Sequence, residues 1–148
     1  MFDLSTIMTT ELVTVHPSTS LYRARELMNE KKIRHLPVVS DDGRLVGLLT
    51  QSDVLAATDS ILKDRDAQLD VAHFPVEDAM VTDLDTVPSS ASLRLAALYL
   101  ERHKIGCLPV VDEGKLVGIV TDTDFVGVAI NLLEQLEDFE PESDDLED

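Results

Sequence analysis

The chain has 148 residues, of which 44% are apolar, enough for one ordinary domain or two very small ones. Aromatic residues make up only 4% and tryptophan is absent, so the core must be aliphatic. The net charge of −17 opposes contact with phosphate backbones or anionic lipid over a large surface, so we expect no nucleic acid partner and no membrane insertion.

The only cysteine is Cys107, which excludes a disulfide within the chain and a thiolate metal cage. The remaining histidines outside the repeat motifs, His16, His73 and His103, lack metal-ligand spacing, so we expect no structural metal. The first residues carry no basic and apolar leader, and the longest apolar stretch, 125–133, is far shorter than the roughly 20 residues that span a bilayer. We therefore expect a cytoplasmic protein.

In the first half, residues 12–15 (LVTV) predict a short strand, and the apolar spacing within 21–28 predicts a helix after a serine-rich start. Residues 35–39 (HLPVV) and 45–50 (LVGLLT) predict two strands joined by an Asp-Gly hairpin turn. A second helix is expected to start near Ser52. The predicted order is β-α-β-β-α.

The second half repeats the first. The stretch from Asp83, "DLDTVPSSASLRLAALYLERHKIGCLPVVDEGKLVGIVTDTDFV", aligns with the stretch from Glu11 at an offset of 72, which falls to 71 after the hairpin turn. Self-similarity at a fixed offset over about 45 residues indicates a duplicated structural unit.

The duplication predicts the domain organisation. We expect a first repeat at 1–57, a helical linker at 58–75, a second repeat at 76–133 and a solvated acidic tail at 134–148. One repeat cannot bury a sheet and two helices alone. The expected fold is therefore a mixed α/β (α+β) arrangement of two β-α-β-β-α units, packed sheet to sheet with pseudo-two-fold symmetry.

Each repeat carries, in order, an I-M-T or D-A-M segment, a strand and helix, L-P-V-V, an acidic-glycine turn and L-V-G-h-h-T-x-x-D, where h is apolar. This pattern resembles the cystathionine-β-synthase (CBS) domain, and two in tandem are similar to the paired module called a Bateman module. The resemblance covers residues 3–133. It implies adenosine-type ligands bound between the repeats, a homodimer, and regulation of another protein.

The T-x-x-D motif has two compatible interpretations. The threonine and aspartate can form a capping box at a helix start, and a carboxylate fixed there can also accept hydrogen bonds from ribose hydroxyls, beside helix N–H groups that favour phosphate. The resemblance implies the ribose role, and a neighbouring hydroxyl lies at the same place in each repeat. The residues concerned are Thr50, Ser52 and Asp53 in one repeat and Thr121, Thr123 and Asp124 in the other.

The ends of the first strands are further candidates. The resemblance implies that Thr14, Val15, Thr86 and Val87 meet a purine through backbone groups and an apolar wall. Their alternative interpretation is plain β propensity, which suits valine in any case.

The repeats differ just before the strand proline. The first reads Arg34-His35-Leu36-Pro37 and the second Gly106-Cys107-Leu108-Pro109. The resemblance implies that the two positions at the start of each stretch face phosphates, where arginine and histidine can donate and glycine and cysteine supply no charge. The alternatives are a solvated arginine, a packed histidine and a buried cysteine that acts as a small hydrophobe. We expect two clefts of unequal strength, and the sequence leaves open which aspartate shares the cleft of Arg34.

The leading hypothesis is a regulatory module that senses AMP, ADP or ATP, without a catalytic cofactor, although magnesium could enter with ATP. The alternatives are an interaction scaffold with vestigial clefts, or a sensor of S-adenosylmethionine or NAD(H). No P-loop or nucleophile–base motif is visible, so we expect no enzyme activity. The apolar face formed by Ile130, Leu133 and Leu136 could pack across a homodimer, and a protein partner would read the signal.

Overall fold

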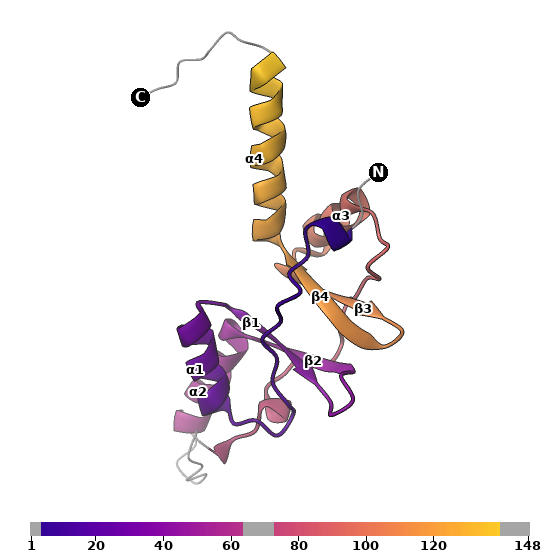
Figure 1. Ribbon diagram of the computed structural model, residues 1–148. Coiled ribbons are helices and arrows are strands. Elements are labelled where there is room, and N and C mark those ends of the chain that lie inside the picture. Colours follow the sequence, from indigo (N-terminus) through magenta and orange to yellow (C-terminus); the bar gives the residue numbers. More distant parts are fainter. Residues whose placement is uncertain (1–3, 64–72, 140–148) are drawn as a thin grey trace, which may run out of the picture.

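The computed structural model describes residues 4–63 and 73–139, and confirms the predicted mixed α/β class (Figure 1). Each half contains a short 3-10 turn, a helix, an antiparallel hairpin and a second helix. The elements are η1 (Leu4–Thr6), α1 (Leu21–Lys31), β1 (His35–Val39), β2 (Leu45–Thr50) and α2 (Gln51–Lys63), then η3 (Val76–Asp78), α3 (Leu93–His103), β3 (Cys107–Asp112), β4 (Lys115–Thr121) and α4 (Asp122–Phe139).

Helices α1 and α3 start and end in the same way. The Ser20 hydroxyl accepts a hydrogen bond from the Arg23 N–H, and the Ser92 hydroxyl accepts one from the Leu95 N–H, both at 3.1 Å. These bonds satisfy one of the backbone donors that a helix start leaves unpaired. Both helices end on a lysine in the left-handed region, with φ of 56° at Lys32 and 55° at Lys104.

The strands expected at 12–15 and 84–87 are shorter than predicted. Each contributes one isolated parallel bridge, Val15 to Val38 and Val87 to Val110. The described sheets are therefore two-stranded hairpins, β1–β2 and β3–β4, with a bulge at the same place in both.

A proline explains why the parallel ladder does not extend. The Val15 N–H donates to the Pro37 carbonyl at 3.0 Å, and the Val39 N–H donates back to the Val15 carbonyl at 2.9 Å. The next bond toward the N-terminus would need an N–H on Pro37, which proline lacks. Pro109 imposes the same limit in the second half, where the Val87 N–H donates to its carbonyl at 3.2 Å.

The segment at the start of each half, residues 4–9 or 76–81, packs against the other half, and we call these two segments the exchanged leading segments. Thr9 forms a two-way backbone pair with Ile119 in β4, at 2.9 and 3.1 Å, and Val81 forms the equivalent pair with Leu48 in β2, at 2.9 Å both ways. Leu4 is fully buried in the core of the second half and Val76 is fully buried in the core of the first. The boundary between the repeats in the sequence is therefore not the boundary between the packed units.

The repeated glycine of L-V-G makes room for the exchanged segments. A Cβ on Gly118 would lie 2.6 Å from the Met8 sulfur and 3.2 Å from the Thr9 carbonyl oxygen, and a Cβ on Gly47 would clash with the Met80 sulfur. Both contacts are tighter than side-chain carbons tolerate. The glycines thus serve close approach of the exchanged methionines, which the sequence alone did not indicate.

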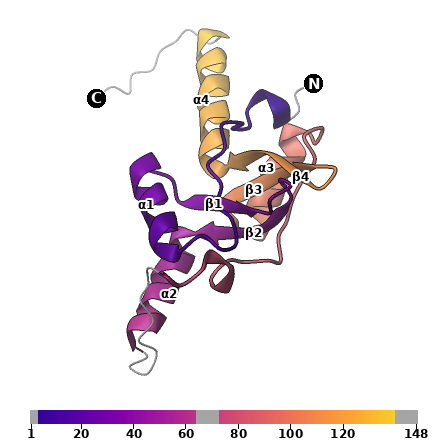
Figure 2. The same cartoon turned by 60° about the horizontal axis from the view of Figure 1, so that its bottom comes forward.

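The hairpins also meet at their tips. Arg44 and Lys115 form an antiparallel bridge, and the Leu116 N–H donates to the Gly43 carbonyl at 3.2 Å. Figures 1 and 2 show the two hairpins side by side between the helices of the two halves. With the exchanged segments, these contacts give the pseudo-two-fold pairing of units that the duplication predicts.

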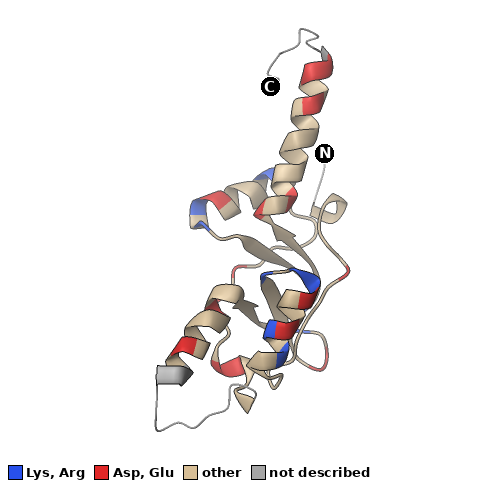
Figure 3. Ribbon diagram, turned by 90° about the vertical axis from the view of Figure 1, so that its left-hand side faces the viewer, with Lys and Arg blue, Asp and Glu red and all other residues tan. Residues whose placement is uncertain are grey.

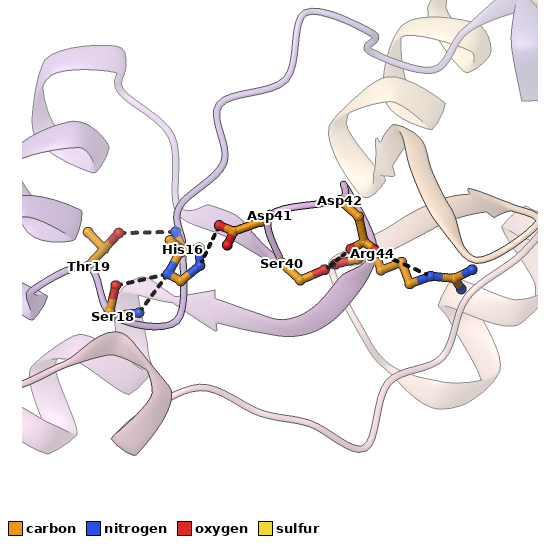
Figure 4. Close-up of polar contacts among 7 residues, drawn as sticks. All are labelled: His16, Ser18, Thr19, Ser40, Asp41, Asp42 and Arg44. Carbon is orange, nitrogen blue, oxygen red and sulfur yellow. Dashed lines mark hydrogen bonds and ion pairs between the residues drawn. The ribbon is translucent and has the colours of Figure 1, made fainter.

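An aspartate of each hairpin contacts the turn before the first helix of its half, from positions that are not equivalent in the two repeats. In the first half the His16 ring Nε2 lies 3.0 Å from Asp41 Oδ1, and the Ser18 hydroxyl lies 2.9 Å from His16 Nδ1 (Figure 4). In the second half Asp112 accepts from the Ser89 N–H at 3.0 Å and from its hydroxyl at 2.6 Å. The sequence differs at these turns, yet the same connection is made.

Helix α4 projects from the body and carries acidic but no basic residues (Figures 1 and 3). It continues to Phe139, so residues 134–139, expected in the tail, are helical, because apolar side chains keep helical spacing through Leu136. Helix α2 likewise runs past residue 57 to Lys63. The rest of the expected tail, 140–148, and linker residues 64–72 lie outside the described residues. Among the helices of the described part, none is long and apolar enough to cross a membrane.

Candidate functional site

The T-x-x-D motifs form caps at the starts of α2 and α4. Asp53 Oδ2 accepts from the Thr50 N–H at 3.0 Å, while the Thr50 hydroxyl accepts from the Asp53 N–H at 3.1 Å. Asp124 Oδ2 accepts from the Thr121 N–H at 2.8 Å. The predicted capping interpretation is thus confirmed. The caps use Oδ2, so each carboxylate is held in place while its Oδ1 takes no part in the cap.

The first cleft, which we call the Arg34 cleft, has a volume of about 280 Å³. One wall is the loop and strand start at 32–35 of the first repeat. The other wall is formed by Ile119 and Thr121 of β4 and by the start of α4 at 122–123, and Thr9 also lines the cleft. This cleft includes Thr121 and Thr123 of the helix start that Asp124 caps, although Asp124 itself is not among the lining residues.

The second cleft, which we call the Gly106 cleft, is the pseudo-symmetric equivalent and also has a volume of about 280 Å³. Leu48 and Thr50 of β2 form one wall, and the stretch 105–107 forms the other, with Pro109 behind it. Residues 81–85 complete the cleft and bring Asp83 and Asp85 to its lining. Each cleft therefore draws on both repeats.

A central cavity of about 240 Å³ shares lining residues with both clefts. It is lined by matching positions of the two repeats, Arg34 with Gly106 and Gln51 with Asp122, together with His35, Thr50 and Ser52. Matching backbone bonds hold its walls, since the Gln51 N–H donates to the Arg34 carbonyl at 3.0 Å and the Asp122 N–H donates to the Gly106 carbonyl at 3.1 Å. Its lining includes one cation, Arg34, and one anion, Asp122.

His35 lines both clefts and the central cavity. Burial lowers its pKa below the ordinary value of 6.5, the charge of Arg34 lowers it further, and the charge of Asp122 opposes the shift. At neutral pH the imidazole is therefore largely uncharged in the free protein. It can donate one hydrogen bond to a ligand, and a negatively charged ligand beside it would raise its pKa.

The CBS domain family model matches residues 4–60 and 76–131, which together exceed half of the chain. The chain belongs to the CBS domain family. Its CBS domain-containing relative YhcV from Bacillus subtilis is 35% identical over 120 residues, which cover 81% of this chain and 80% of that protein. By contrast, the match to homoserine O-acetyltransferase from Methanocorpusculum labreanum, 34% identical, covers 78% of this chain and only 22% of that enzyme.

Solved CBS structures have the same fold. A putative acetoin utilization protein (AcuB) from Vibrio cholerae superposes with a TM-score of 0.81 at 40% identity, over 93% of this chain and 97% of that chain. CBSX2 in complex with AMP gives a TM-score of 0.78 at 36% identity, over 89% and 98%. The CBS domain pair of protein MJ0100, in complex with 5′-methylthioadenosine and S-adenosylmethionine, gives 0.74 at 26% identity, over 88% and 98%.

Cys107 behaves in this CBS pair as a packed apolar group. Its side chain is buried, and burial together with the nearby charges of Asp122 and Asp124 raises the pKa of its thiol to about 12. The thiol is therefore protonated and a poor nucleophile. Within the described residues, no group of three His, Cys, Asp or Glu side chains is arranged to hold a metal ion.

Several predicted site residues lie in the CBS cores rather than on the cavity walls. Leu36 and Leu108 are completely buried, and Val15 and Val87 are almost so. These side chains pack the cores. The other candidates off the three cavity linings are Thr14, Asp53 and Asp124, which are half-buried, Pro37, which is buried, and Thr86, which is exposed. The purine role that the resemblance implies for the strand ends stays a prediction.

The structure adds residues that the sequence analysis missed. Lys32 lies in the Arg34 cleft, and Asp122 lines the Arg34 cleft, the central cavity and a groove between α3 and α4. A signal for Asp122 was present, because the equivalent position of the first CBS repeat is Gln51, which carries no charge. That difference stands one residue after the shared threonine.

Proposed function

We propose that this CBS pair is a regulatory module that binds an adenosine-type ligand and signals the occupancy to a partner protein. One observation carries the proposal: each cleft joins the strand start of one repeat to a capped helix start of the other. A ligand bridging the two repeats would bind one arrangement of them better than others, and differential binding is what shifts a conformational equilibrium.

The Arg34 cleft suits a phosphorylated nucleoside. The capped Asp124 would accept from ribose hydroxyls through the oxygen outside the cap, and the guanidinium of Arg34 and the ammonium of Lys32 would pair with phosphate oxygens. His35 would donate a further hydrogen bond. The relative CBSX2, whose crystal structure contains AMP, supports this ligand class.

The Gly106 cleft suits an adenosyl ligand without phosphate. Gly106 and Cys107 supply no cation, whereas Asp83 and Asp85 line the cleft with negative charge. That charge disfavours phosphate and favours a cationic group such as the sulfonium of S-adenosylmethionine. The complex of MJ0100 with that ligand supports this second candidate. We propose regulation rather than catalysis, in the cytoplasm, with magnesium entering only alongside polyphosphates.

Calorimetric titration of AMP against Asp124→Asn tests the proposal, because an amide oxygen can keep the cap while the charge is lost. We expect AMP affinity to fall at least about tenfold, as for loss of a charged hydrogen bond. Asp53→Asn, in the other cleft, is the matched control and should change AMP affinity less than about twofold. Equal effects of the two variants would contradict the assignment of clefts. A folded wild type that binds no adenosyl ligand would favour the scaffold alternative.

We further propose that α4 pairs two copies of the chain. Val126, Ile130, Leu133 and Leu136 expose 52–61% of their surface at helical spacing along the projecting helix. A charged side chain in the middle of such a face should oppose association. We expect light scattering to show a wild-type dimer and a Leu133→Glu monomer, with Leu95→Glu, exposed on α3, still dimeric. A monomeric wild type would contradict this.

A further inference from the structure

Asp122 lines the same two cavities as Arg34, a cation of the proposed nucleotide site. It is the first residue of α4 and lines both the Arg34 cleft and the central cavity. Its position is exposed, and its backbone is held by the bond from its N–H to the Gly106 carbonyl at 3.1 Å. Asp122 thus places a negative charge on the walls of both cavities.

The carboxylate lies across one glycine from His35. A Cβ built on Gly106 would be 3.5 Å from Asp122 Oδ2 and 3.8 Å from His35 Nε2. The field of Asp122 is also felt by the imidazole, whose pKa it raises against burial and Arg34. Any phosphate that reached into the central cavity toward His35 would therefore pass close to a like charge.

The linings of the Arg34 cleft and the central cavity together carry two cations, Lys32 and Arg34, and one carboxylate, Asp122. Lys32 and Arg34 line the Arg34 cleft, and a nucleoside monophosphate brings about two negative charges near neutral pH. Beyond them, the central cavity offers no further lysine or arginine among the described residues, and Asp122 adds a negative charge. The equivalent position of the first repeat, Gln51, is neutral, so the repulsion is specific to this side.

We infer that Asp122 restricts the Arg34 cleft to adenosyl ligands with a single phosphate group, by repelling the second and third phosphates of ADP and ATP. The inference rests on the proposed nucleotide function and names the ligand class within it. Discrimination by a fixed like charge acts against the wrong ligand rather than for the right one. Because Asp122 is solvent-exposed, screening keeps the effect moderate.

The test compares AMP, ADP and ATP by calorimetric titration against wild type, Asp122→Asn and Asp138→Asn. Asparagine has nearly the same shape as aspartate, so Asp122→Asn removes the charge with little change in packing. Asp138→Asn removes the same charge from the same helix, about 24 Å farther along it. A pH of about 8 keeps His35 neutral in all three proteins, and a chelator removes divalent cations that would mask the ATP charge.

We expect wild type to bind AMP more tightly than ATP, and Asp122→Asn to improve ATP affinity about five- to tenfold while AMP affinity changes less than about twofold. Asp138→Asn should leave the ratio of ATP to AMP affinity unchanged. Wild type that binds ATP as tightly as AMP, or a ratio that Asp122→Asn does not move, would overturn this inference alone. If none of the three nucleotides binds folded wild type, the proposed nucleotide function falls, and the inference falls with it.

Discussion

Replacing Leu4 with alanine is expected to lower the free energy of unfolding by about 3 kcal/mol, because Leu4 is completely buried and Leu→Ala changes in cores cost 2–5 kcal/mol. The damage should fall on the second CBS unit, although residue 4 belongs to the first repeat in the sequence. Leu4 packs in the core with Val87, Ala96 and Leu108, and its N–H donates to the Ala91 carbonyl at 3.0 Å.

Denaturant unfolding with amide hydrogen exchange would locate that loss. We expect the amides of β3 and β4 to lose more protection than those of β1 and β2. Leu95→Ala is the matched control, since Leu95 is 54% exposed on α3 and should cost less than about 0.5 kcal/mol. If Leu4→Ala instead loosened β1 and β2, the leading segment would pack on its own repeat and the exchange would be wrong.

The exchange shows why the sequence predicted the elements better than their pairing. Helix starts at Ser20 and Ser92 and the hairpin turns, in which an acidic residue precedes glycine, are local signals, so they were predictable from the sequence. The core in which each leading segment packs was not predictable in this way. Leu4 and Val76 are both aliphatic and meet two aliphatic cores built by duplication, so local pattern fits either core. The choice is made by long-range contacts, such as the pair between Thr9 and Ile119, that no local signal records.

The predicted first strands are shorter in the structure for a reason that the sequence contains. Residues 12–15 have strand composition, yet a strand needs a partner that can donate hydrogen bonds along its length. The partner strand contains Pro37, whose missing N–H stops the ladder after one bridge. The proline is visible in the sequence, but its effect on a third segment depends on the register of the strands.

For the candidate site, too, the individual residues were predictable from the sequence and their pairing was not. Arg34 and His35 were singled out because their equivalents are Gly106 and Cys107, and the structure places both on cavity walls. Their pairing with the helix start of the other repeat depends on how the units pack, so it was not predictable. Leu36 and Leu108 share the motif but alternate to the opposite face of their strands, which puts them in the cores.

Arg34→Ala is expected to weaken AMP binding about ten- to a hundredfold and to leave adenosine binding unchanged. A charged hydrogen bond to phosphate contributes about 1.5–3 kcal/mol, and 1.4 kcal/mol corresponds to a factor of ten. Arg34 is the only arginine on the wall of the Arg34 cleft, and its side chain is exposed, so its removal leaves the core intact. The backbone carbonyl that accepts from the Gln51 N–H is retained in alanine.

Titration of AMP and of adenosine distinguishes loss of the Arg34 charge from a change in the shape of the loop. Arg23→Ala removes the same charge from α1, where Arg23 forms an exposed ion pair with Glu26 at 3.3 Å, and should leave both affinities within about twofold. A parallel loss of adenosine and AMP in Arg34→Ala would mean that the arginine shapes the loop rather than binds phosphate. Loss confined to AMP would place the phosphate at the start of β1. A longer phosphate chain that extended from there into the central cavity would approach Asp122.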